Sequence, residues 1–274
     1  MPTQGLLMDD IANYLCGRAL YGDNFNLEQI AEWYADEEEA YANLGAGNSA
    51  AYSYGYHAWN WYHAYRHLET ISYDNVLGFG SAYGDELKPI ATRMRKVTVV
   101  DPSLAFVRTQ VHGVPATYVK PAPNGRLPLM AGEFDYISCL GVLHHIPNVS
   151  FVLSELARVL ATGGHMVVRE PIVSMGDWRQ PRRGLTKRER GIPLHVLESI
   201  IQACGLQVTR KSLCAFPVTP RLFRTIRSDT YNSRFATRVD ALLSGAFAWN
   251  VNYHPTSLLQ RLRPTSVFLV LKKA

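Results

Sequence analysis

The stretch DNVLGFGSAYGDEL, residues 74–87, decides the fold of this chain, because an apolar run ends there in a turn with glycines at 78, 80 and 84. Glycine accepts the left-handed backbone of a tight turn and leaves the backbone N–H groups open to a ligand. A second apolar run, VTVV at 97–100, ends in Asp101. A carboxylate at that point can accept hydrogen bonds from both ribose hydroxyls of an adenosine-containing cofactor. We therefore predict that Gly80 and Asp101 hold one such cofactor at the carboxyl edge of a parallel sheet.

Strands and helices alternate beyond residue 74. Apolar runs predict strands at 74–79, 97–100, 116–119, 134–140, 165–169, 206–212 and 267–272, and periodic apolar residues predict helices at 149–160 and 193–204. This alternation predicts an α/β fold, in which a Rossmann-like, mostly parallel sheet of seven strands has helices on both faces.

The chain is expected to have two parts. Residues 1–70 are predicted to form an N-terminal helical extension or lid, with one helix at 27–44, capped by Asn26, and another from about 51 to 68. Residues 71–274 are predicted to form the α/β domain. This domain carries a basic insertion at about 173–192 and a basic helical segment at about 219–262.

Four segments resemble consecutive segments of one protein family. They are VLGFGSAYG at 76–84, VVDPS at 99–103, FDYISCLGVLHHIPN at 134–148 and LARVLATGGHMVVREP at 156–171. Over residues 72–172 the chain is similar to class I S-adenosylmethionine-dependent methyltransferases, in particular to the small-molecule branch of methyltransferase types 11 and 12. The resemblance implies that S-adenosylmethionine is the cofactor and that an oxygen or nitrogen of a small acceptor is methylated.

The resemblance also implies a set of cofactor-binding residues. By position these are Gly78, Gly80, Ala82, Gly84, Asp101, Pro102, Asn124, Leu140 and Gly141. This chain departs from the family's usual pattern at three of them. The family usually has an acidic residue where Gly78 stands, a glycine where Ala82 stands, and an aspartate near the place of Asn124. A degenerate relative that does not catalyse methyl transfer is therefore one alternative.

Residues that could meet the acceptor follow the predicted strands or precede the first one. His144, His145 and Glu170 are candidate general bases, although histidines at this place also serve packing, and Arg169 could pair with Glu170. Arg169 is also a candidate for binding the acceptor. The others are Tyr54, His57 and Trp61 on the predicted helix at 51–68, and Arg182 and Arg183 in the basic insertion. Arginine matches phosphate or carboxylate geometry, so a phosphorylated or acidic acceptor is predicted. The alternative for the aromatic residues is a helix face packed in the core, and the alternative for the arginines is a solvated or salt-bridged loop.

Charge is distributed unevenly along the chain. Residues 1–70 hold 2 Lys and Arg against 10 Asp and Glu, whereas residues 171–274 hold 17 against 5. The basic C-terminal third of the chain could attract anions, or it could lie against the acidic N-terminal part. Nucleic acid is an unlikely partner, because the tetrad of base amino-methylases is absent after the strand at 134–140. A nicotinamide-dependent oxidoreductase is another alternative, but Tyr83 replaces the third glycine of the dinucleotide motif.

Composition limits the remaining classes. The four cysteines lie far apart, with no Cys-x-x-Cys pair, and no metal site is expected. No apolar stretch approaches the roughly 18 residues of a membrane span, and no secretory signal is visible at the N-terminus. The expected location is the cytoplasm.

Overall fold

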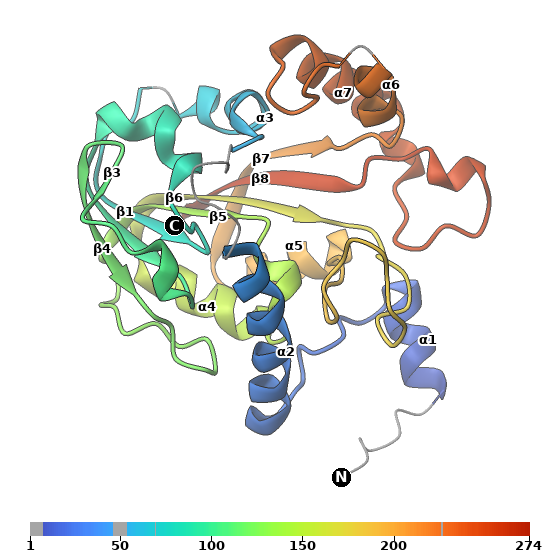
Figure 1. Ribbon diagram of the computed structural model, residues 1–274, viewed down its shortest axis with the longest axis horizontal. Coiled ribbons are helices and arrows are strands. Elements are labelled where there is room, and N and C mark those ends of the chain that lie inside the picture. The colour runs from blue at the N-terminus through green and yellow to red at the C-terminus, as the bar shows by residue number, and fades with distance from the viewer. Residues whose placement is uncertain (1–7, 46–53, 69, 226) are drawn as a thin grey trace.

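The computed structural model of the protein describes residues 8–45, 54–68, 70–225 and 227–274. It has the predicted α/β pattern of strands and helices (Figure 1). The strands are β1 (Tyr73–Phe79), β2 (Met94–Val100), β3 (Gln110–Val111), β4 (Val114–Val119), β5 (Phe134–Leu140), β6 (Leu160–Pro171), β7 (Leu206–Cys214) and β8 (Ser266–Lys273). All seven predicted strands are confirmed. The two-residue strand β3 makes the sheet eight-stranded rather than seven-stranded.

The order of the sheet, β3-β4-β2-β1-β5-β6-β8-β7, puts β1 near its centre (Figure 1). Strand β1 pairs in parallel with β2 and with β5, so that Phe79 lies opposite Val100 on one side and Cys139 on the other. The carboxyl ends of these three strands therefore meet at one edge of the sheet. Strand β8 runs antiparallel to both of its neighbours, β6 and β7.

Two α-helices cover one face of the sheet. They are α4 (Val149–Val159) and α5 (Leu194–Ala203), each within a residue or two of its predicted limits. Their apolar side chains pack on the strands, and Leu153 and Leu197 are completely buried with Ile137 of β5. Burying one such side chain stabilises the fold by about 1.5–3 kcal/mol, so this layer is a main source of stability.

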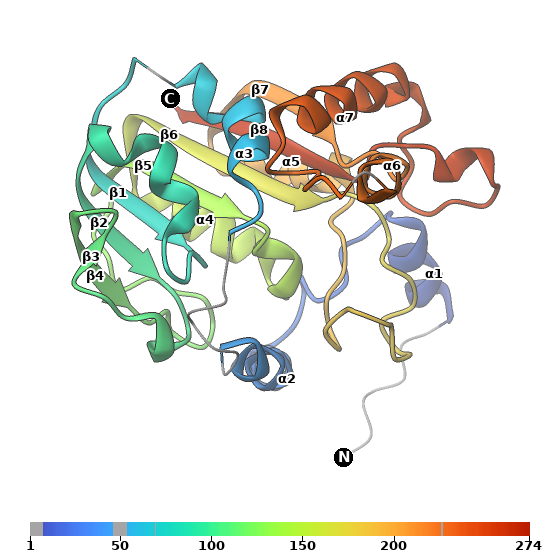
Figure 2. The same ribbon diagram turned by 45° about the horizontal axis from the view of Figure 1, so that its top comes forward.

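The second face is covered by shorter elements and by α7 (Arg234–Ala246), as Figure 2 shows. The helix α3 (His57–His63) and the 3-10 helix η1 (Tyr65–His67) pack there through Trp59 and Tyr65 against Phe268 and other strand residues. A helix was predicted from about residue 51 to 68. The described helix begins at His57, residues 54–56 before it are not helical, and residues 51–53 lie outside the described residues.

The segment after the glycine-rich turn is a 3-10 helix, η2 (Asp85–Arg93), and not an α-helix. Pro89 lies inside it. Proline has no N–H to donate, and its ring clashes with the carbonyl group four residues earlier, so an α-helix cannot run through this position undistorted.

The N-terminal part contains α1 (Met8–Cys16) and α2 (Leu27–Gly45). The predicted cap of α2 is confirmed, because Asn26 Oδ1 accepts a hydrogen bond from Gln29 N at 2.9 Å and Gln29 Oε1 accepts one from Asn26 N at 3.0 Å. This reciprocal arrangement satisfies two backbone donors at the helix start.

The predicted basic helical segment 219–262 contains α6 (Thr219–Thr225), α7 and two single-turn 3-10 helices, Ala248–Asn250 and Leu259–Arg261. It connects β7 to β8. Among the described helices, none combines the length and the apolar character that crossing a membrane requires.

The ring of His63 joins α3 to the sheet and makes stability depend on pH. Its Nδ1 lies 2.7 Å from Ser212 Oγ on β7, and burial lowers its pKa to about 3. The unfolded chain binds a proton at this histidine below a pH of about 6.5, whereas the folded chain does not. We expect the free energy of unfolding to fall by roughly 1 kcal/mol for each pH unit below about 6.5, in addition to what other groups contribute. Urea unfolding of the wild type and of His63→Phe between pH 7 and 5 measures this, and equal slopes for the two proteins would contradict it.

Candidate active site

The glycine-rich turn lies directly beside the end of β2, as predicted. Gly80 N donates to Val100 O at 2.8 Å, and Ala82 N donates to Asp101 Oδ2 at 3.1 Å. Asp101 Oδ1 accepts a second bond from Ser103 N at 2.9 Å. Gly80 and Asp101 therefore share one edge of the sheet, and the adjoining Pro102 is exposed there. Each oxygen of the Asp101 carboxylate has a second lone pair for a further donor.

The backbone of this turn explains its small residues. Gly80, Ala82 and Gly84 have φ of +63°, +46° and +74°, all in the left-handed region. A Cβ atom on Gly80 would lie 2.6 Å from Val142, so the turns after β1 and β5 approach each other too closely for any side chain there. Ala82 is strained by its own φ, which explains why glycine suits this position. The turn after β1 therefore packs closely against the Val142 side chain of the turn after β5.

Gly78 differs from the other two glycines of the motif, because its φ is not positive and its neighbours decide what it tolerates. A Cβ atom at this position would lie 2.5 Å from Ser81 Oγ and 3.5 Å from Glu86 Oε1. The carboxyl group of Glu86 is buried and accepts a hydrogen bond from Ser138 Oγ of β5 at 3.1 Å. Glu86 therefore brings a carboxyl group from η2 to the space next to Gly78. Spacing along the sequence does not reveal it, because Glu86 comes eight residues later in the chain.

Burial changes the acidity of both carboxyl groups at this edge. It raises the pKa of Glu86 to about 7, although hydrogen bonds from Ser81 and Ser138 oppose this rise. It also raises the pKa of Asp101 above its usual value, against the opposing effect of the backbone donors of Ser103 and Ala82. Glu86 therefore changes its charge near neutral pH.

The turn after β5 is held by the carboxylate of Glu170, which is completely buried. Its Oε1 accepts bonds from Val142 N at 2.9 Å and Leu143 N at 2.8 Å, and its Oε2 lies 2.7 Å from His144 Nδ1. Burial alone would raise the pKa of Glu170, but His144 and the backbone donors lower it below its ordinary value. An ionised carboxylate only accepts, so His144 Nδ1 carries the proton and Nε2 carries a lone pair.

The two candidate histidines have separate carboxylate partners. Burial lowers the pKa of His144, although Glu170 opposes this, so its ring is neutral at pH 7. His145 Nδ1 lies 2.9 Å from Glu37 Oε2 of α2. Glu189 Oε1 lies 3.6 Å from His144 Nε2. His144, His145 and Glu189 each offer one atom within 4.8 Å of the others, a group that could hold a metal ion, although no metal ligands were expected from the sequence.

Arg169 was expected to pair with Glu170, but the two side chains point to opposite faces of β6. Successive residues of a strand alternate in direction, and this separates them. Arg169 Nη1 donates to Asn60 Oδ1 at 3.1 Å, and Nη2 donates to Leu140 O at 3.2 Å. Its guanidinium lies 4.7 Å from the ring centre of Tyr56 and 5.1 Å from that of Trp59.

This places Arg169 near the candidate cofactor edge. Gly141 N donates to Arg169 O at 2.7 Å, and a Cβ atom on Gly141 would lie 3.0 Å from Arg169 Nη2. Leu140 and Gly141, predicted to pass the cofactor, thus lie against the side chain predicted to meet the acceptor.

The aromatic helix α3 buries residues other than the predicted acceptor candidates. Tyr54, His57 and Trp61 were expected on one helix, but the buried residues of α3 are Trp59, Asn60 and His63. Tyr54 precedes the helix, so it does not share a helical face with His57 and Trp61. Tyr54 still approaches the group around Arg169, since its hydroxyl accepts a bond from Asn60 Nδ2 at 2.6 Å. His57 and Trp61 are half-buried.

Most cations of the basic insertion are used within the protein. Arg182 donates to the backbone carbonyls of Met175, Thr186, Lys187 and Glu189, and Arg183 is exposed. Arg188 Nε donates to Asp36 Oδ2 at 2.7 Å, and Lys187 Nζ donates to Asp36 Oδ1 at 2.7 Å. Among the described side chains, the ion pairs of the acidic helix α2 are therefore with the insertion, and none is with the segment 219–262.

The docking of α2 has a buried centre as well as a charged rim. Trp33 is completely buried, and its Nε1 donates to His145 O at 2.7 Å. Arg190, which is 2% exposed, donates through Nε to Tyr21 O at 2.8 Å and through Nη2 to Ile146 O at 2.8 Å. Burial lowers the pKa of Arg190 to about 10, so it stays charged. Residues of the N-terminal part, the turn after β5 and the insertion thus form one connected unit.

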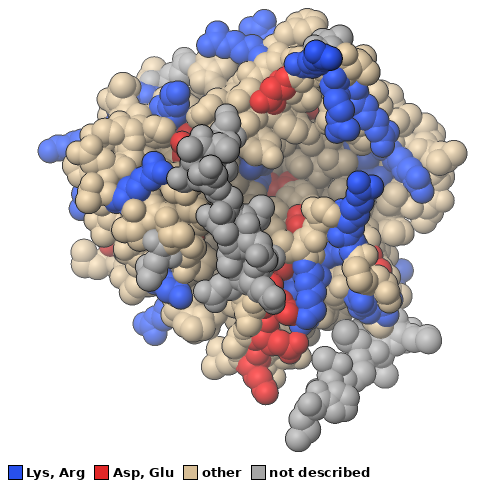
Figure 3. Space-filling view, viewed as in Figure 1, with Lys and Arg blue, Asp and Glu red and all other residues tan. Residues whose placement is uncertain are grey.

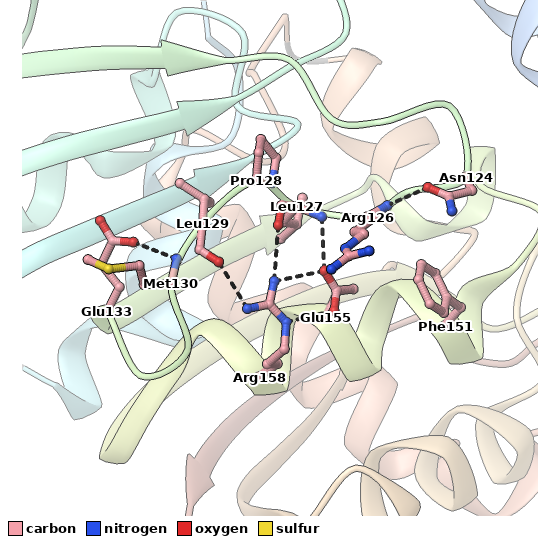
Figure 4. Close-up of a pocket in the computed structure, with 10 residues that line it drawn as sticks. All are labelled: Asn124, Arg126, Leu127, Pro128, Leu129, Met130, Glu133, Phe151, Glu155 and Arg158. Carbon is pink, nitrogen blue, oxygen red and sulfur yellow. Dashed lines mark hydrogen bonds and ion pairs between the residues drawn. The ribbon is translucent and has the colours of Figure 1, made fainter.

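Asn124 lies beyond the end of β4 (Figure 4). Its Oδ1 accepts a bond from Arg126 N at 3.1 Å, and its carbonyl accepts one from Asn148 Nδ2 at 2.8 Å. It lines a cavity of about 970 Å³ that runs along α4 to Glu133. Arg158 and Glu155 in this cavity bond to each other and to the backbone at Leu127 (Figure 4). Gly80 and Asp101 are not among its lining residues, so it is separate from the candidate site.

Comparison with known proteins identifies the segment around this edge. Residues 77–168 match a family model described as a methyltransferase domain. A ubiquinone biosynthesis O-methyltransferase of Dechloromonas aromatica is 32% identical over 96 residues, which are 33% of this chain and 41% of that protein. The chain spans about two fifths of the length of the first curated relatives that it matches.

Solved structures share the fold. An S-adenosylmethionine-dependent methyltransferase from Mesorhizobium loti has a TM-score of 0.51 at 14% identity, with 78% of this chain and 97% of that chain covered. The [4+2]-cyclase SpnF has a TM-score of 0.54 at 17% identity, with 91% and 97% covered. At these identities the likeness establishes the fold alone.

Glu37 and Glu32 of α2 provide a matched test of the docked helix. Glu37 is buried and accepts bonds from Thr186 Oγ1 at 2.8 Å and Arg188 N at 3.0 Å, besides its contact with His145. Glu32 reaches only Arg188, and its side chain is 58% exposed. We expect Glu37→Ala to lower the free energy of unfolding by about 2–4 kcal/mol, because it leaves buried donors unpaired. We expect Glu32→Ala to lower it by less than about 1 kcal/mol. Urea titrations measure both values, and similar losses would show that Glu37 is not central.

Proposed function

Because residues 77–168 are a methyltransferase domain of the class I S-adenosylmethionine-dependent family, we propose that this protein transfers a methyl group from S-adenosylmethionine to a small acceptor. The observation that carries the proposal is the edge at which the left-handed turn of Gly80 and Ala82 meets the carboxylate of Asp101. This edge places a left-handed glycine turn beside an acid that can bind a ribose, and both are features that an adenosine-binding site uses.

The cofactor residues have distinct roles in this proposal. Asp101 accepts hydrogen bonds from the ribose hydroxyls, and Gly80 and Gly84 keep the turn open. The carboxyl group of Glu86 takes the place of the acid that the family usually carries where Gly78 stands, and it would hold the cationic amino group of the cofactor. Leu140 and Gly141 pass the methionine end. Bound S-adenosylmethionine supplies an electrophilic methyl group, so the protein mainly aligns the acceptor and excludes water.

His144 is the proposed general base for a hydroxyl acceptor. Its Nε2 keeps a lone pair because Glu170 holds the proton on Nδ1, and its lowered pKa keeps the ring neutral. Bound S-adenosylmethionine would supply the methyl group to the acceptor oxygen, and His144 Nε2 would take up the proton that this oxygen loses. Glu170, which was considered as a base, is a positioning residue here because it is completely buried and already bonded to the backbone.

Arg169 and the aromatic residues around it support an acceptor with a flat or acidic group. The guanidinium lies among the rings of Tyr56, Trp59 and Phe268, next to Gly141. Arginine binds carboxylate and phosphate groups in a forked geometry, and aromatic faces suit a planar acceptor. Arg182 has a structural role in this proposal because its donors serve backbone carbonyls, so Arg169 replaces it as the main anion-binding residue.

The second candidate is a protein that shares the fold but does not transfer methyl groups. The similarity to the [4+2]-cyclase SpnF supports it, because one fold can host different reactions. The strained Ala82 also supports weaker cofactor binding. Transfer of a methyl group from S-adenosylmethionine separates the two candidates, and binding of S-adenosylhomocysteine, the product left after transfer, tests whether the cofactor site is intact.

S-adenosylhomocysteine is expected to raise the melting temperature by roughly 5 °C at a hundredfold excess over its dissociation constant, whereas NAD is not. Asp101→Ala should weaken binding by about 10-fold to 100-fold, because the ribose hydroxyls lose a charged acceptor. Asp74→Ala removes an exposed acid of the same sheet and should leave binding unchanged. Binding of NAD in place of S-adenosylhomocysteine, or of neither ligand, would refute the proposal.

Glu86 makes cofactor binding depend on pH. Since its pKa is about 7, the carboxylate forms as the pH rises from 6 to 8, and affinity for S-adenosylhomocysteine should rise over this range. Glu86→Gln keeps the shape of the side chain, so the variant should fold and bind more weakly, with less dependence on pH. Asp85→Asn removes the neighbouring carboxylate as a control. Calorimetric titration at three pH values measures this, and an unchanged pH profile in Glu86→Gln would exclude the role of Glu86.

A further inference from the structure

Exposed apolar side chains are concentrated in the segment between β7 and β8. Among the described residues, seven of the thirteen exposed large apolar side chains fall between residues 218 and 259. They are Val218, Leu222, Phe235, Leu242, Trp249, Leu258 and Leu259. Single exposed apolar residues are common on proteins, but such a concentration marks an interaction surface.

The stripe on α7 has a regular spacing. Phe235 and Leu242 are seven residues apart, which puts them on one face of the helix, and Trp249 follows after seven more. Their exposed fractions are 69%, 73% and 70%. A surface helix normally turns its apolar face inward. Helix α7 therefore presents outward the kind of stripe that other helices bury.

The inward face of α7 is small and polar. Ala236, Thr237, Asp240 and Ser244 are buried there. The carboxylate of Asp240 accepts bonds from Ala215 N and Phe216 N, both at 2.8 Å, at the end of β7. Because these bonds fix the helix by its polar side, the outward stripe of Phe235 and Leu242 is a firm feature of the fold.

Positive charge accompanies the apolar stripe. Between residues 218 and 261 the chain has six arginines, no lysine and two aspartates, one of which is the buried Asp240. The arginines, all exposed, are Arg221, Arg224, Arg227, Arg234, Arg238 and Arg261. In the described part of the chain, none of them has a carboxylate within 4.0 Å. In Figure 3, basic side chains gather in the region where Figure 1 has α6 and α7.

We propose that these exposed apolar and arginine side chains of residues 218–261, the docking surface, bind the face of an anionic lipid bilayer. Phenylalanine, leucine and tryptophan insert at the boundary between headgroups and acyl chains, and arginines pair with lipid phosphates. The charge of the surface complements such a bilayer. The apolar stripe favours a bilayer over a nucleic acid, because a phosphate backbone offers nothing for Leu242 and Phe235 to enter.

The docking surface is attached to the helix that borders the candidate acceptor side. Trp59 N donates to Tyr231 O at 2.9 Å, and the rings of these two residues stack at 4.4 Å. His57 N donates to Asn232 Oδ1 at 2.8 Å. A docked protein therefore holds α3 close to the bilayer. The docking itself does not depend on the proposed methyl transfer.

Cosedimentation of the full chain with vesicles tests the proposal. Vesicles of phosphatidylcholine with phosphatidylglycerol should bind the protein, vesicles of phosphatidylcholine alone should bind it far less, and added salt should release it. The double variant Phe235→Ser with Leu242→Ser should lower the partition coefficient at least about tenfold. Leu27→Ser with Met130→Ser removes side chains of matched exposure, 69% and 72%, and should have no effect.

The charge variants form a second arm of this experiment. Arg221→Ala with Arg238→Ala should lower partitioning about 25-fold, since each cation near an anionic membrane contributes about fivefold. Lys96→Ala with Lys120→Ala, exposed cations elsewhere, should leave it unchanged. Melting curves check that each variant folds. Equal binding to both kinds of vesicle, or to neither, overturns the proposal. So does salt-sensitive binding of RNA, or a dimer in sedimentation, that the Phe235 and Leu242 changes abolish while vesicle binding is unaffected.

Discussion

The buried carboxylate of Glu170 is the constraint on which the candidate site depends. It joins the end of β6 to the turn after β5 by accepting hydrogen bonds from Val142 N, Leu143 N and His144 Nδ1. The cost of burying this charge is offset only while those donors are in place. The turn therefore has one stable arrangement. That arrangement sets the position of Val142 against Gly80 and the tautomer of His144.

Two kinds of electrostatic contact have different consequences in this protein. The pair of the exposed Lys187 with Asp36 orients α2 but contributes little free energy. The buried contacts of Glu37 and Arg190 connect three distant parts of the chain and tolerate little change. The uneven charge of the sequence therefore has two explanations. Part of the basic excess neutralises α2, and part, on α6 and α7, remains on the surface.

The sequence predicted the sheet well because strand ends carry local signals. The turn at Gly80, the aspartate at 101 and the apolar runs are each recognisable within a few residues, and they lie at one edge as expected. Side-chain partners were harder to predict because they depend on alternation and distance. Arg169 donates to Asn60 and does not pair with Glu170. Glu86, on η2, lies next to Gly78 although it comes later in the chain. The limits of α3 were wrong because the aromatic run continues beyond the helix, where composition alone cannot mark its ends.

The contacts of Arg190 affect the order in which parts of the protein fold. The N-terminal helices are synthesised before residues 188–190. The carbonyl of Tyr21 accepts a hydrogen bond from the guanidinium of Arg190, which lies 169 residues later in the chain. Glu37 accepts one from Arg188 N, which lies 151 residues later. Closing such long loops is slow compared with forming a helix. The N-terminal helices therefore form before the contacts that dock them on residues 188–190.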